Sequence, residues 1–127
     1  MIRVMIVDDD KNFVDTFYDN LKEKLGECEI FVAYSFKEAL DILTNHSNLC
    51  DVIICDVAVG DMSGTDFLKL IKASEKLKNI NVIMISAKYV EPMDRIEALK
   101  NGAVAYFVKP FDIEKIANEI KYYARKK

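Results

Sequence analysis

Residues 52–56 read Val-Ile-Ile-Cys-Asp, an apolar run that ends in a single carboxylate. The four apolar residues do not alternate with polar ones, which is typical of a strand buried on both faces of a parallel sheet. Four further runs of this kind are predicted as strands, at residues 2–7, 29–33, 81–86 and 103–108. Helix-like segments separate them, so the alternation predicts an α/β fold with a five-stranded parallel sheet covered by helices.

The segments between the strands carry apolar residues at helical spacing, and each apolar stripe is expected to dock on the sheet. The stripes consist of Phe13, Phe17, Leu21 and Leu25, then Phe36, Ala39, Leu40 and Leu43, then Phe67, Leu68 and Ile71, then Ile96 and Leu99, then Ile113, Ile116 and Ile120. Ser35 and Glu38 form a capping-box pattern, Gly26 and Gly102 are placed to end helices, and Pro92 suits a first helical turn. These signals agree with the predicted helix limits.

Composition restricts the class of protein. A chain of 127 residues with 51% hydrophobic composition is expected to form one domain over residues 1–127. No apolar run approaches the roughly 20 residues of a membrane-spanning helix, and the amino terminus lacks signal-peptide features, so we expect a cytoplasmic location without membrane contact. A net charge of -3 argues against nucleic-acid binding by this domain. The 3 cysteines and 1 histidine lack zinc-site spacing, which indicates reduced, mostly buried thiols.

Polar side chains gather at the ends of the predicted strands. Asp8, Asp9 and Asp10 follow the first strand, Asp56 ends the third, Ser86 ends the fourth and Lys109 follows the fifth. Ligands of open parallel sheets bind at this carboxyl edge. Several carboxylates meeting there repel one another unless a cation compensates them, and oxygen ligands favour a hard ion such as Mg²⁺.

An ammonium and a hydroxyl at the same edge are suited to the oxygens of a phosphoryl group, and a carboxylate can form an acyl phosphate. The strand ends therefore indicate a magnesium-dependent phosphoryl site. Each residue taken alone also has a structural interpretation: Asp9 or Asp10 as a helix cap, Ser86 as a partner of loop backbone groups, and Lys109 as a solvated strand end.

At these positions the sequence resembles the response regulator receiver family, the CheY-like fold, over essentially its whole length. Residues 6–9 resemble the acidic pair of the family, residues 52–56 its phosphoacceptor strand, residues 84–87 its hydroxyl position and residues 106–111 its lysine segment. The resemblance implies a flavodoxin-like (βα)5 fold with strand order 2-1-3-4-5.

The resemblance also implies roles for individual residues. Asp56 would be the phosphoacceptor, and Asp8, Asp9, Asp56 and the backbone carbonyl of Ala58 would hold Mg²⁺. Lys109 and Ser86 would contact the phosphoryl group. Ser86 and Tyr106 would form the switch, with Tyr106 turning inward; an ordinary half-buried strand aromatic is the plainer interpretation of Tyr106. A cis peptide bond before Pro110 is common in the family and costs little before proline.

The implied partners are a sensor histidine kinase or phosphotransfer protein, which donates a phosphoryl group from phosphohistidine, and an output domain or target protein of unknown identity. The surface of helix four, strand five and helix five would change on phosphorylation and is a family route to homodimers. The chain would catalyse only its own phosphorylation and dephosphorylation and is not expected to be an enzyme in the usual sense.

Several positions depart from the family pattern. Gly60 stands where proline is usual, so the loop after Asp56 is expected to be less constrained. Ser86 replaces the more usual threonine and keeps the hydroxyl. Ala58 and Lys88 occupy positions that tune dephosphorylation in the family, so the lifetime of the phosphorylated state stays open.

Three other functions fit parts of this sequence. A haloacid-dehalogenase-like phosphatase would use Asp8 as nucleophile in an Asp-x-Asp pattern, but Asn12 stands where it needs threonine, and Asp56 would have no role. A flavodoxin-like cofactor binder would share the topology, yet acidic residues after the first strand would repel a phosphate. A receiver-like scaffold that no longer uses phosphate is favoured only by the altered loop.

Overall fold

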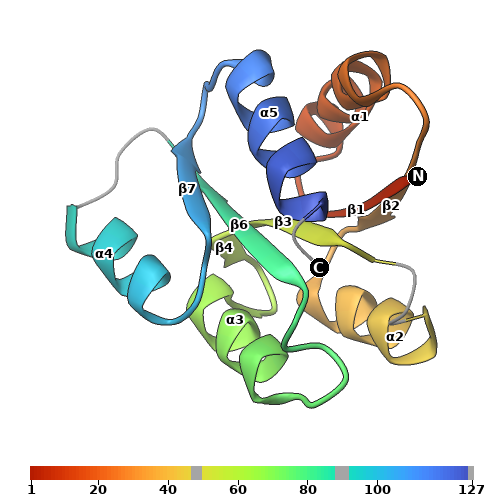
Figure 1. Cartoon of the computed structure of the whole chain (residues 1–127). Coiled ribbons are helices and arrows are strands. Elements are labelled where there is room, and N and C mark those ends of the chain that lie inside the picture. Colours follow the sequence, from red (N-terminus) through yellow and green to blue (C-terminus); the bar gives the residue numbers. More distant parts are fainter. Residues whose placement is uncertain (47–49, 88–91, 126–127) are drawn as a thin grey trace.

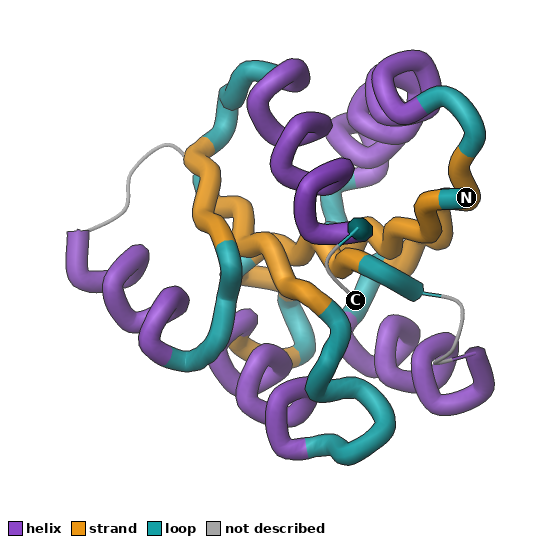
Figure 2. Tube along the Cα trace, in the orientation of Figure 1, coloured by secondary structure: helices purple, strands orange, loops and turns teal. Residues whose placement is uncertain are grey.

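The computed structural model describes residues 1–46, 50–87 and 92–125. Its central layer is one parallel sheet of five strands in the order β2-β1-β3-β6-β7 (Figures 1 and 2). The strands are β1 (Ile2–Val7), β2 (Cys28–Ala33), β3 (Val52–Asp56), β6 (Asn81–Ser86) and β7 (Ala105–Val108). The predicted fold and strand order 2-1-3-4-5 are thereby confirmed.

Two strand limits differ from the predicted ones. β2 begins at Cys28 rather than at residue 29, because the ladder with β1 extends to the pair Ile2 and Cys28. β7 begins at Ala105 rather than at residue 103. The Ala103 backbone N–H donates to the Ala98 carbonyl at 3.0 Å, so Ala103 belongs to the turn that leaves the preceding helix.

Helices cover both faces of the sheet (Figure 1). α1 (Lys11–Leu25) and α5 (Ile113–Ala124) lie on one face, and α2 (Phe36–His46), α3 (Gly64–Ala73) and α4 (Pro92–Lys100) lie on the other. β1 shows why its sequence is continuously apolar: Val4 and Ile6 pack in the cluster with α1 and α5, whereas Met5 and Val7 pack in the cluster with α2 and α3.

The predicted helix limits rest on local hydrogen bonds. Asp10 is the N-cap of α1, and its carboxylate accepts the Phe13 N–H at 3.1 Å. The Ser35 hydroxyl accepts the Glu38 N–H at 3.0 Å, as the capping-box pattern indicates. Gly26 and Gly102 have φ values of 70° and 111° at helix ends, a region that favours glycine.

The prediction for α4 was wrong. Ile96 and Leu99 were expected to dock on the sheet, but their exposed fractions are 51% and 43%. The helix is turned so that the small side chain of Ala98, 4% exposed, lies against the sheet near Tyr106. Because the alanine side chain is short, α4 can lie close to the sheet. Ile96 and Leu99 are then left on the solvent side of the helix.

The loop after β3 forms a small hairpin that was not predicted. β4 (Ala58–Val59) pairs antiparallel with β5 (Met62–Ser63) around a turn at Gly60 and Asp61. The Asp61 carboxylate accepts hydrogen bonds from the backbone N–H groups of Phe36 at 3.1 Å and Lys37 at 3.0 Å, so the turn is tied to the first residues of α2.

Within the described segments, no helix combines the length and apolarity needed to cross a membrane.

Candidate phosphoryl-transfer site

Four of the predicted site residues meet at the carboxyl edge of the sheet. β1, β3, β6 and β7 are successive neighbours, so Asp8, Asp56, Ser86 and Lys109 end or follow adjacent strands. The Lys109 Nζ lies 2.8 Å from an oxygen of Asp8 and 2.8 Å from an oxygen of Asp56. The Lys109 backbone N–H donates to the Ser86 carbonyl at 2.8 Å. The strand order thus brings together residues that are far apart in the chain.

The two carboxylates differ in burial. Asp8 is 1% exposed and Asp56 is 8% exposed. One oxygen of Asp8 accepts the Asp10 N–H at 3.0 Å, and one oxygen of Asp56 accepts the Ala58 N–H at 2.8 Å, which leaves the second oxygen of each for Lys109. Burial raises the pKa of Asp8 above its usual value, against the lowering effect of the hydrogen bonds from Lys109 and Asp10.

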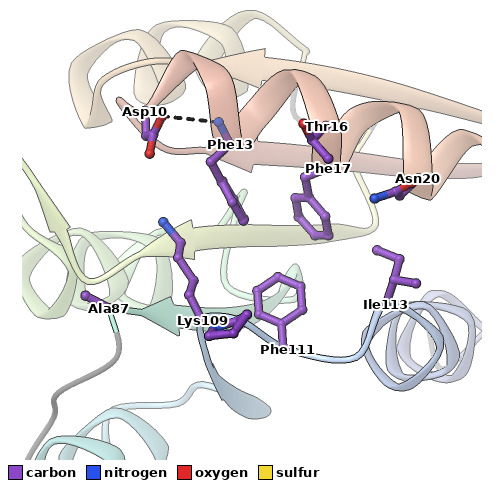
Figure 3. A pocket seen from close by; sticks show the side chains of 10 residues that line it. Asp10, Phe13, Thr16, Phe17, Asn20, Ala87, Lys109, Phe111 and Ile113 are labelled. Atoms are coloured by element: carbon purple, nitrogen blue, oxygen red, sulfur yellow. Dashed lines mark hydrogen bonds between the residues drawn. The ribbon is translucent and has the colours of Figure 1, made fainter.

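Lys109 is the cation of the site. Desolvation would lower its pKa, but hydrogen bonds to Asp56 and Asp8 outweigh that effect and raise the pKa above the usual value of lysine. The side chain therefore stays an ammonium at neutral pH. Its Nζ also lies 4.0 Å from the centroid of the Phe13 ring, within the range of a cation–π contact. Figure 3 shows the Lys109 side chain reaching toward α1.

Asp9 and Asp10 lie apart from this pair. Asp9 is exposed, and its carboxylate accepts a long hydrogen bond, 3.4 Å, from the Gly60 N–H. Asp10 caps α1, so the structural interpretation given for Asp9 or Asp10 holds for Asp10. Among the described residues, no three His, Cys, Asp or Glu side chains converge on a single point. Ala58 opens β4 two residues after Asp56, and Lys88 falls outside the described residues.

Two hydroxyls lie buried behind the strand ends. Ser86 is 0% exposed and Tyr106 is 6% exposed, so Tyr106 is more deeply buried than an ordinary half-buried strand residue. Neither hydroxyl has a hydrogen-bond partner within the part of the chain that the structure describes. The Tyr106 side chain, including its hydroxyl, is buried in the core in this structure. Buried hydroxyls are normally paired, so the Ser86 oxygen is suited to a ligand atom at the strand ends.

A groove adjoins the site between α1 and the segment that follows β7 (Figure 3). It encloses about 570 Å³ and is lined by aromatic rings that include Phe13, Phe17 and Phe111, with Lys109 at one end. The Lys109–Pro110 peptide bond is cis, as expected from the resemblance. Phe13 was predicted as a core residue, and its contact with the site was not predicted, because a residue that faces the core and one that faces the site have the same helical spacing.

Comparisons with known proteins identify the family of the chain. The family model for the response regulator receiver domain matches residues 4–121 of this chain. The chain is 34% identical to sporulation initiation phosphotransferase F of Bacillus subtilis, over 95% of this chain and 92% of that protein. It is 33% identical to the transcriptional regulatory protein MalR of the same organism, where the match spans 99% of this chain but 52% of MalR. A match to the Arabidopsis thaliana response regulator ARR10 spans only 22% of that protein.

Solved structures show the same fold. A response regulator receiver domain protein from Clostridium thermocellum superimposes with a TM-score of 0.89 at 25% identity, covering 99% of this chain and 96% of that one. The chemotaxis response regulator CheY4 of Vibrio cholerae gives a TM-score of 0.83 at 26% identity, covering 97% and 98%. With its sheet order, strand-end residues and family match taken together, this chain belongs to the response regulator receiver domain family.

Proposed function

We propose that this receiver domain accepts a phosphoryl group on Asp56, with Mg²⁺, from the phosphohistidine of a sensor histidine kinase or phosphotransfer protein. One observation carries the proposal: the Lys109 ammonium lies 2.8 Å from a carboxylate oxygen of Asp56 and 2.8 Å from one of Asp8. A carboxylate nucleophile thereby has a fixed positive charge beside it, where the oxygens of an incoming phosphoryl group would bring negative charge.

The donor set suits Mg²⁺. Asp8 and Asp56 share the Lys109 ammonium, so the two carboxylates carry one negative charge more than this lysine balances. The exposed carboxylate of Asp9 adds a further charge nearby, and all of these side chains offer oxygen ligands. Asp8, Asp9, Asp56 and the backbone carbonyl of Ala58 would hold the ion, which when bound neutralises charge on the phosphoryl oxygens. The 3.4 Å hydrogen bond to Asp9 is long, so turning this side chain toward its neighbours costs little.

In the transfer step, an oxygen of Asp56 forms a bond to phosphorus while the P–N bond to the donor imidazole breaks. The imidazole leaves with the electron pair of that bond and takes up a proton. Lys109 stays an ammonium and offsets the charge on the phosphoryl oxygens. The buried hydroxyl of Ser86 donates a hydrogen bond to one of them, and so acquires a partner.

The switch would begin at Ser86 and reach the surface through β7 and α4. The Tyr106 ring packs in the same cluster as Ala98 of α4, so a shift of Ser86 and Tyr106 changes how α4 sits on the sheet. The three elements α4, β7 and α5 each expose large apolar side chains, which suits contact with an output partner or a second copy of the domain. They are Met93, Ile96 and Leu99 of α4, Val108 of β7 and Tyr122 of α5.

The haloacid-dehalogenase-like alternative has less support. It requires Asp8 to attack, but Asp8 is more deeply buried than Asp56, at 1% against 8% exposed. The lifetime of the phosphorylated state depends on positions 58 and 88. Ala58 is exposed and carries no polar atom beyond the backbone, so it cannot position a water molecule for hydrolysis through its side chain.

The proposal is tested by intact mass measurement. The protein is incubated with acetyl phosphate or phosphoramidate, with and without Mg²⁺, beside an Asp56→Asn control. We expect one phosphoryl adduct that requires the metal and disappears in the control. Absence of an adduct with both donors would contradict the proposal and favour a phosphate-independent scaffold. An adduct that persists in the control would point to Asp8 and revive the phosphatase interpretation.

A further inference from the structure

Phe13 is held rigidly beside the site. It lies in the first turn of α1, where its backbone N–H donates to the N-cap Asp10 at 3.1 Å. Its ring packs against Phe17, with centroids 5.3 Å apart, and against Phe111 in an edge-to-face contact at 6.1 Å. The backbone cap and the two neighbouring rings together fix where the face of the Phe13 ring points.

That face lies against the Lys109 ammonium (Figure 3). The Nζ is 4.0 Å from the ring centroid, and the same nitrogen is 2.8 Å from both Asp8 and Asp56. Lysine has a flexible stem, and the Lys109 side chain is 22% exposed at the end of a groove, so it has space to turn outward when its contacts to the carboxylates break. The ring gives the ammonium a third contact beside those with the two carboxylates.

We propose that Phe13 is a positioning residue, which holds the Lys109 ammonium against Asp56 through a cation–π contact. The inference rests on the proposed phosphorylation of Asp56. An aromatic face suits this task because it attracts a cation without adding a formal charge or a metal ligand to an acidic site. Phe13 acts through Lys109 and does not itself touch the phosphoryl group.

Fluorination of the ring gives the sharpest test. Mono-, di- and trifluorophenylalanine at position 13 withdraw electron density from the ring face while nearly keeping its shape, so the cation–π attraction falls stepwise. We expect the rate of Asp56 phosphorylation by acetyl phosphate, at saturating Mg²⁺, to fall with each fluorine, by about three- to tenfold in total. Phe13→Tyr keeps an aromatic face and is expected to keep the rate.

Phe17 provides the matched control. Its ring packs against Phe13 and Phe111 in the same cluster and is 3% exposed, and the contact to the Lys109 ammonium is made by Phe13. The same fluorinated series at position 17 is expected to leave the rate unchanged. A fall of equal size in both series would mean that general packing sets the rate, and would overturn the role of Phe13.

A second measurement does not depend on activity. In the metal-free protein, ring current from Phe13 is expected to shift the NMR signals of the Lys109 ε-methylene protons upfield. The shift should be lost in Phe13→Leu and kept in Phe13→Tyr. No phosphoryl adduct in the wild-type protein would overturn both this inference and the proposed function. If the wild-type protein is phosphorylated but the rate does not change along the fluorinated series at position 13, the role of Phe13 alone would be overturned. The same holds if the upfield shift is absent.

Discussion

Asp8 is a buried carboxylate whose charge is costly without a metal ion. Its pKa is raised mainly by burial, so the folded state binds its proton more tightly than the unfolded state does. A raised folded pKa contributes stability that is fully present below the unfolded value, about pH 4, and is lost as the pH rises through the folded value. Ionisation of Asp8 therefore lowers the stability of the folded state.

Asp8→Asn removes this charge and keeps an oxygen for the Asp10 N–H. In metal-free buffer, we expect the free energy of unfolding of the variant to increase relative to that of the wild type as the pH rises above about 4, because only the wild type has to ionise a buried carboxyl group. Urea unfolding at several pH values measures the difference. A difference that stays constant with pH would mean that Asp8 ionises in the folded state as easily as in the unfolded chain.

At the residue scale, the sequence predicted the site because it is made of strand ends. Asp56, Ser86 and Lys109 each interrupt an apolar run at its carboxyl end, which is a pattern visible without coordinates. Phe13 and Asp61 were missed for different reasons. Phe13 has the spacing of a core residue, and the partners of Asp61 are backbone groups of α2, which lie 25 and 24 residues away in the chain.

At the scale of elements, Asp61 constrains the loop that follows the phosphoacceptor. Desolvation would raise its pKa, but hydrogen bonds from the Lys37, Phe36 and Asp61 backbone N–H groups outweigh it and lower the pKa. Gly60 removes the rigidity of the usual proline, and the two bonds from Asp61 to α2 restrain the same turn. Whether the loop remains more mobile than that of its relatives stays a prediction.

Asp61→Ala is expected to lower the free energy of unfolding by about 1 kcal/mol at pH 7, because two N–H groups at the start of α2 lose their acceptor. A lowered folded pKa contributes stability above the unfolded value of about 4 that is lost as the pH falls through the folded value. The difference from wild type should therefore shrink below pH 4 in urea unfolding. Equal free energies of unfolding of the two proteins at pH 7 would show that water replaces the Asp61 carboxylate as the acceptor without loss of stability.

α4 shows where helical periodicity was insufficient. Ile96 and Leu99 share a face, and the sequence gives no sign that this face is turned to solvent while Ala98 contacts the sheet. Periodicity identifies an apolar stripe, but a stripe that binds a partner has the same spacing as one that binds the core. The orientation follows from packing against β7, which a single sequence does not reveal.

The orientation of α4 can be tested with two substitutions on the same helix. Ile96→Ser is expected to change the free energy of unfolding by no more than about 0.5 kcal/mol, because the side chain is 51% exposed. Ala98→Leu should lower it by about 1–3 kcal/mol, because the added atoms have no space against the sheet. Thermal or urea unfolding compares them. The reverse order of effects would mean that Ile96 faces the core.

At the scale of the whole molecule, the site exists because five parallel strands end at one edge. The order β2-β1-β3-β6-β7 sets β1 beside β3 and β6 beside β7, and Lys109 reaches across to Asp8, 101 residues away in the chain. The alternation of apolar runs and amphipathic segments was sufficient to predict a parallel sheet with helices on both faces, because such a sheet requires continuously apolar strands. The strand order was predicted from the resemblance to the receiver family. The β4–β5 hairpin was not predictable from that alternation, since each of its strands has two residues.

The central claim is that Asp56 carries the phosphoryl group, and the position of the adduct tests it most directly. Protein phosphorylated in the presence of Mg²⁺ is reduced with borohydride, which converts an aspartyl phosphate to homoserine, and the chain is then mapped by peptide mass spectrometry. We predict homoserine at position 56 and unchanged aspartate at positions 8, 9 and 10. Homoserine at one of those positions, or a stable phosphate ester on Ser86 with Asp56 unmodified, would contradict the account.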